Sequence, residues 1–182
     1  MRRLVALVVV SILAVSPGTA AESGVNEQFA LEGTDIDSVE FQSVAPAGES
    51  FSISVHLSEE ARENGTTVGW ITQVCINSGV CYAPETHSLE SEDGSIWTGA
   101  IVPDETVTYV NWKFVLQHEG ESQTDVPETG FGWKVWSDCW HDNGTWGGSS
   151  TECQEERGIL PGFSVSAAVF STSMAALMAR RD

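Results

Sequence analysis

Hydrophobic and polar residues alternate along several short segments in the middle of the chain. The clearest is FSISVHL at residues 51–57, where Phe51, Ile53, Val55 and Leu57 fall on one side and polar residues on the other. A strict period of two is typical of a β-strand that buries one face. The pattern therefore predicts a strand here, at the surface of a hydrophobic core.

Four further segments have the same β-branched and aromatic character. They are residues 68–75, 95–102, 106–116 and 132–140. Within 106–116, one face carries Val110, Trp112, Phe114 and Leu116. Clusters of Gly, Pro, Asn and Asp separate these segments, and no helical period of useful length occurs between residues 24 and 157. We therefore predict an all-β antiparallel sandwich.

The strand order in APAGESFSISVHL and GSIWTGAIVPDETVTYVNWKFVL resembles immunoglobulin-like and fibronectin-III-like modules of cell-surface proteins. The resemblance spans roughly residues 36–136 and implies one immunoglobulin-like domain. We place this domain at 39–157, a length that suits a single core. Residues 22–38 precede it and are interpreted as a loose acidic lead-in.

The two ends of the sequence carry targeting patterns. Residues 1–21 begin with Arg2 and Arg3, continue with an apolar run and end in small residues, an order that predicts a secretory signal peptide. Residues 158–179 contain no charge over 22 positions and are followed by Arg180 and Arg181. This pattern predicts a C-terminal transmembrane helix within 158–182, with the domain outside the cytoplasm. The alternative is an apolar terminal helix that packs on the domain.

The last 23 residues, LPGFSVSAAVFSTSMAALMARRD, resemble the PGF-CTERM sorting signal of archaeal surface proteins. The resemblance rests on Pro161, Gly162 and Phe163, the hydrophobic stretch and the terminal arginines. It implies an archaeal protein that is anchored at the cell surface. It also implies cleavage by an archaeosortase near the tripeptide, after which a lipid replaces the helix.

Charge and motif content exclude several functions. Residues 22–157 hold four basic and 25 acidic residues, a formal charge of −21, which repels nucleic acids and anionic lipid head groups. Phosphate-binding loops and hydrolase motifs are missing from the sequence. The histidines lie far apart without metal-binding spacing: His56, His87, His118 and His141. We therefore predict no metal, cofactor or nucleic-acid partner.

The four cysteines all fall between the two targeting segments. In an exported chain they predict two disulfides, with three possible pairings. Proximity favours Cys75–Cys81 and Cys139–Cys153. The first pair would close a small hairpin turn and the second a loop rich in Gly, Ser and Thr.

The stretch TQVCINSGVCYAPET resembles the active-site hairpin of the amino-terminal domain of the DsbD thiol:disulfide reductase family. The resemblance covers about 13 residues. It implies that Cys75 and Cys81 form a redox pair whose access is shaped by Tyr82 and Pro84. The alternative is a structural disulfide, as is usual in exported proteins.

Two other features suggest binding or modification. Clustered aromatic residues after residue 132 are candidates for stacking on a carbohydrate, unless they fill the core: Trp133, Trp136, Trp140 and Trp146. Asn64 and Asn143 each begin an Asn-Gly-Thr glycosylation sequon. Taken as a whole, the sequence favours an exported, membrane-anchored, disulfide-stabilised binding or structural module of the cell surface, non-enzymatic, with an unidentified surface or exported partner. Thiol–disulfide exchange and carbohydrate binding are the alternatives.

Overall fold

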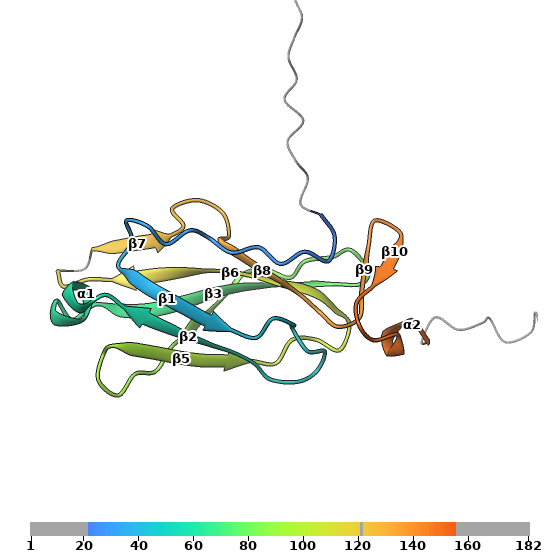
Figure 1. Ribbon diagram of the computed structural model, residues 1–182, viewed down its shortest axis with the longest axis horizontal. Helices are drawn as coiled ribbons and strands as arrows, with labels where there is room; N and C mark the ends of the chain where they lie inside the picture. The colour runs from blue at the N-terminus through green and yellow to red at the C-terminus, as the bar shows by residue number, and fades with distance from the viewer. Residues whose placement is uncertain (1–21, 121, 156–182) are drawn as a thin grey trace, which may run out of the picture.

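The computed structural model describes residues 22–120 and 122–155 (Figure 1). The predicted signal peptide at 1–21, the anchor at 158–182 and the tripeptide Pro161, Gly162 and Phe163 lie outside the described residues. The described chain is mostly β-strand, arranged in antiparallel sheets with two very short helices. The predicted all-β class is therefore confirmed.

One sheet has three antiparallel strands in the order β1-β2-β5. They are β1 (Ile36–Phe41), β2 (Phe51–Leu57) and β5 (Ile96–Ile101). The two strands predicted at 51–57 and 95–102 are β2 and β5. The inward positions of β2 are Phe51, Ile53, Val55 and Leu57, all buried as the alternation predicts.

The other sheet is built around the long strand β6 (Val107–Gln117), which pairs with β3 (Thr67–Ile76) along one edge. On its other edge β6 pairs with β7 (Gln123–Val126) at one end and with β8 (Trp133–Trp136) at the other. The strand β4 (Glu85–Ser88) pairs with the outer edge of β3.

Four short elements complete the described fold. The helix α1 (Glu59–Glu63) follows β2, and the Ser58 hydroxyl accepts a hydrogen bond from the backbone N–H of Ala61 to cap it. A separate hairpin consists of β9 (Trp140–Asp142) and β10 (Thr145–Gly147), and α2 (Glu152–Glu155) comes last. Figure 1 shows β9, β10 and α2 together at one end of the sandwich.

The core lies between the two sheets and is rich in tryptophan. Trp70 of β3, Trp112 of β6 and Trp133 of β8 are all essentially inaccessible to solvent. Trp112 and Trp133 stack with an interplanar angle of 6°, and Phe51 of the opposite sheet packs against Trp112 at 5.5 Å. These contacts join the two layers into a sandwich, as the alternation in the sequence predicts.

The segment that precedes β1 differs from the loose lead-in expected over 22–38. Glu27 exchanges two backbone hydrogen bonds with Lys134 of β8, at 3.0 and 3.1 Å. The indole N–H of Trp136 donates to the carbonyl of Val25 at 2.9 Å. Residues 25–27 thus cover part of the outer edge of β8, which would otherwise present unpaired backbone groups to solvent.

Candidate redox hairpin

Both predicted disulfides are present. Cys75 lies near the end of β3, and Cys81 returns beside it in an antiparallel bridge. The backbone N–H of Ile76 donates to Val80, and that of Tyr82 donates to Val74, both at 2.9 Å. The two cysteines therefore occupy a non-hydrogen-bonded pair, the position at which antiparallel strands approach most closely. Their Cα atoms are 3.9 Å apart.

The two halves of this disulfide differ in exposure. Cys75 pairs with Tyr109 of the neighbouring strand β6 and is only 3% exposed. Cys81 follows the turn, lies outside the named strands and is exposed. A molecule that approaches from solvent therefore meets Cys81 first.

The turn between the cysteines is fixed by backbone geometry and by Asn77. Gly79, with φ +82°, donates from its N–H to the carbonyl of Ile76 at 2.8 Å, and only glycine takes this conformation at low cost. Asn77 is 5% exposed, and its backbone N–H donates to Thr106 at 2.8 Å. The hairpin is thus closed by bonds that do not involve sulfur.

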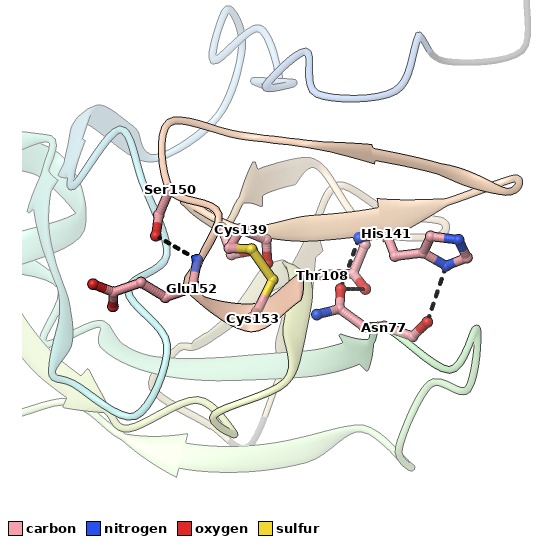
Figure 2. The surroundings of a disulfide bond; sticks show 8 residues. Asn77, Thr108, Cys139, His141, Ser150, Glu152 and Cys153 are labelled. Atoms are coloured by element: carbon pink, nitrogen blue, oxygen red, sulfur yellow. Dashed lines mark hydrogen bonds between the residues drawn. A yellow bond between two sulfur atoms is a disulfide. The ribbon is translucent and has the colours of Figure 1, made fainter. Parts of the chain in front are cut away.

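The side chain of Asn77 also joins the hairpin to β9. Its Oδ1 accepts from the Thr108 hydroxyl at 2.9 Å and from the backbone N–H of His141 at 2.8 Å. The carbonyl of Asn77 lies 3.2 Å from Nδ1 of His141. Figure 2 shows this group beside the second disulfide. The two cysteine pairs therefore flank one hydrogen-bonded junction at the end of the sandwich.

A tyrosine lies against the exposed sulfur. The hydroxyl of Tyr109 is 3.9 Å from Sγ of Cys81, and because a disulfide sulfur carries no hydrogen, the hydroxyl is the donor. The ammonium of Lys134 lies 5.0 Å from the centroid of the Tyr109 ring. Sequence reasoning missed both residues, since nothing in the spacing of Tyr109 and Lys134 relates them to Cys81.

The hairpin is bordered by apolar side chains that face solvent. Val80, Tyr82 and Val102 are all exposed, and the last two line a cavity of about 270 Å³ together with Asp104. Hydrogen bonds from the side chain and the backbone of Thr106 lower the pKa of Asp104, which keeps it ionised. The surface beside Cys81 thus combines apolar contacts with a fixed negative charge.

The second disulfide has a different setting. Cys139 is buried, and its partner Cys153 belongs to α2, 14 residues later. The chain between them contains the small hairpin of β9 and β10. After this hairpin the backbone N–H of Ser150 donates to the carbonyl of Asp138 at 2.8 Å. Cys139–Cys153 therefore holds the C-terminal side of this segment, while the contacts of His141 with Asn77 hold β9 to the rest of the sandwich.

The four candidate tryptophans do not form one open platform. Trp133 and Trp136 are only 1% and 5% exposed. Trp140 packs edge-on against Trp136 at 4.9 Å, and Trp146 packs against His141 at 4.8 Å. Two of the four side chains thus belong to the interior, and the other two cover it at the end of the sandwich.

The remaining candidates are scattered. Three of the four histidines accept or donate at threonine hydroxyls or a backbone carbonyl: His87, His118 and His141. Within residues 22–120 and 122–155, no group of three or more His, Cys, Asp or Glu side chains could hold a metal ion. Asn64 ends α1, and Asn143 lies in the turn between β9 and β10.

No protein-family model matches the chain, and no curated protein is similar to it. Among the residues that the structure describes, no helix is both long and apolar enough to cross a membrane.

Proposed function

We propose that the protein acts outside the cytoplasm as a surface-anchored, immunoglobulin-like module that exchanges its Cys75–Cys81 disulfide with thiols of partner proteins. The export and anchor patterns at the two ends of the sequence support the location. The three-stranded sheet packed on a larger one, with Trp70 in the core, supports the immunoglobulin-like fold.

One observation carries the proposed chemistry: the disulfide joins two residues that are already held side by side. Backbone hydrogen bonds on both sides of the pair and the bonds of Asn77 close the hairpin without sulfur. A covalent link over so short a loop gains about 2 kcal/mol from chain entropy, even before this preorganisation is counted. The disulfide therefore adds little to the stability of a hairpin that hydrogen bonds already close. After reduction, the two thiols stay aligned and can re-form the bond readily.

The exposure of Cys81 defines the order of events. A partner thiolate attacks Sγ of Cys81, a mixed disulfide forms, and the electron pair of the broken S–S bond leaves on Cys75, which takes up a proton. A second thiolate of the partner then attacks the sulfur of the partner's first cysteine in the mixed disulfide. The partner's disulfide forms, and Cys81 is released as a thiolate. The partner loses two electrons, and the Cys75/Cys81 pair gains them.

The reverse sequence reduces a partner disulfide, and the relative potentials of the two proteins decide the direction. Tyr109 is placed to assist in either case, because its hydroxyl can donate to the negative charge that develops on the Cys81 sulfur. The exposed side chains of Val80, Tyr82 and Val102 offer apolar contact to a partner.

The second candidate is a non-enzymatic binding module in which the same disulfide is only a staple. The apolar border of the hairpin favours it, since Tyr82 and Val102 would serve a partner equally well without exchange.

The reduction potential of each disulfide distinguishes the two candidates. The purified protein would be equilibrated with a series of glutathione buffers, quenched, and its free thiols mapped by mass spectrometry. Exchange predicts that Cys75–Cys81 is reduced near about −200 mV while Cys139–Cys153, in the same sample, stays oxidised. A potential below about −300 mV for Cys75–Cys81 would leave the binding module as the function.

A further inference from the structure

The two glycosylation sequons of the chain have the same sequence but opposite settings. Residues 64–66 and 143–145 both read Asn-Gly-Thr. A sequon is used through the amide of its asparagine and the hydroxyl of its third residue, so both groups must be reachable from solvent. The structure separates the two sequons on this requirement.

The sequon at 143–145 forms the tip of the β9–β10 hairpin. Asp142 pairs with Thr145, so that Asn143 and Gly144 alone make the loop, with φ +48° and +82°. Positive φ at both central residues defines a type I′ turn, for which Asn-Gly is the preferred sequence. Asn143, Gly144 and Thr145 are all exposed. The amide of Asn143 donates to Asp142 at 3.0 Å, a surface contact that water can replace.

The sequon at 64–66 is half hidden. Asn64 is exposed at the end of α1, but Thr66 is only 2% exposed. The Thr66 hydroxyl lies 3.2 Å from Nδ1 of His118, and its backbone N–H donates to Ala61 at 3.0 Å. Thr66 immediately precedes β3, so its position is fixed once β3 has paired with β6. In the folded chain the Asn64 amide is therefore reachable from solvent, but the Thr66 hydroxyl is not.

We propose that Asn143 is the N-glycan acceptor of the folded protein and that Asn64 is closed to modification once the sandwich has formed. The donor is an oligosaccharide linked to a lipid phosphate. The amide nitrogen of Asn143 forms a bond to the anomeric carbon of the sugar and loses a proton, and the bond from that carbon to the phosphate oxygen breaks. The proposal relies on export of the protein, because such donors are used outside the cytoplasm. It does not rely on the chemistry of Cys75 and Cys81.

The same geometry orders events at the other sequon. Asn64 can be modified only while Thr66 is free of His118 and β3 is unpaired. Occupancy of Asn64 in the natural protein would then record transfer to a chain that had not yet folded, whereas occupancy of Asn143 carries no such information. One protein thus contains a sequon that reports on folding and one that does not.

The test uses the full chain, purified in folded form from a host that lacks N-glycosylation. It is incubated with a lipid-linked oligosaccharide and an oligosaccharyltransferase, and the occupancy of each site is followed by mass spectrometry of peptides. Synthetic peptides 60–70 and 139–149, the second with Cys139 blocked, measure how well each sequon is used without the fold. Asn64→Gln and Asn143→Gln are matched variants, each removing one acceptor.

We expect the two peptides to be modified at rates within a few-fold of each other, and the folded protein to be modified at Asn143 at least tenfold faster than at Asn64. Asn143→Gln should then slow modification of the folded protein at least tenfold, while Asn64→Gln leaves it nearly unchanged. Equal rates at the two sites of the folded chain would overturn the proposal. So would a folded chain that stays unmodified at Asn143 although its peptide is a good acceptor.

Discussion

Replacing Asn77 with alanine tests whether the hairpin that carries Cys75 and Cys81 is held in place by the hydrogen bonds of the Asn77 side chain. The substitution leaves the backbone bonds of the turn intact and removes the side-chain amide, including Oδ1. That atom accepts from the Thr108 hydroxyl at 2.9 Å and from the His141 backbone N–H at 2.8 Å. The effect therefore isolates the junction between the hairpin and β9.

The magnitude follows from the burial of the two donors. Thr108 is buried and His141 half-buried, so the first donor is left without a partner in the interior and the second is partly rescued by water. A buried donor without an acceptor costs about 1–3 kcal/mol. We expect Asn77→Ala to lower the free energy of unfolding by about 2–4 kcal/mol, a large part of the total for a domain of this size.

The assay is urea unfolding of the oxidised protein, followed by tryptophan fluorescence. With a slope of about 2 kcal/mol per molar urea, the midpoint should fall by about 1–2 M. Asn111→Ala is the matched control, because Asn111 is half-buried on the outer face of β6, and its cost should stay within about 0.5 kcal/mol.

A double-mutant cycle identifies the cause. Thr108→Val removes the stranded donor, so combining it with Asn77→Ala should cost about 1 kcal/mol less than the sum of the two single effects. If the two costs simply add, or if Asn77→Ala alone costs less than about 1 kcal/mol, the junction does not hold the hairpin and our reasoning about preorganised cysteines fails.

Three further predictions concern the sandwich and its end. Leu116→Ala removes a fully buried side chain and should cost about 2–5 kcal/mol in urea unfolding; a smaller loss would mean that the core relaxes around the cavity. Gly148→Ala should lower the melting temperature more than Gly144→Ala. Both glycines have positive φ, but only at Gly148 would the added carbon overlap a backbone carbonyl. The hydrogen bond from Lys113 lowers the pKa of Asp125. The stabilisation is therefore present above about pH 4 and is lost as pH falls, so Asp125→Asn should flatten the acid limb of a stability–pH curve, and an unchanged limb would refute this.

The strands that the sequence predicts are those that bury a regular face. Strand β1 escapes the pattern because its pairing with β2 shifts between Ile36 and Ser38, so its inward residues no longer alternate. The edge strands β4 (ETHS) and β7 (QTDV) are polar, and polar side chains such as His87 and Asp125 join them to the neighbouring strands. Hydrophobic periodicity carries no signal for pairing of that kind.

The candidate site shows the same division. The two disulfides follow from the number and proximity of the cysteines. The contacts that give the first one its character do not, because Tyr109 is 28 positions from Cys81 and His141 is 64 positions from Asn77. Such contacts are created by the pairing of distant strands, and no local pattern records them.

The junction around Asn77 also fixes where the Cys75–Cys81 hairpin lies relative to the C-terminal end of the described chain. Through His141 and the Cys139–Cys153 bond, the hairpin shares one end of the sandwich with α2, where the described chain stops (Figures 1 and 2). From Glu155 to Phe163 there are eight residues, which span at most about 28 Å when fully extended. An anchor at Pro161, Gly162 and Phe163 would keep Cys81 close to the membrane, within reach of partners that are themselves held there. Large soluble proteins would have to approach from the side.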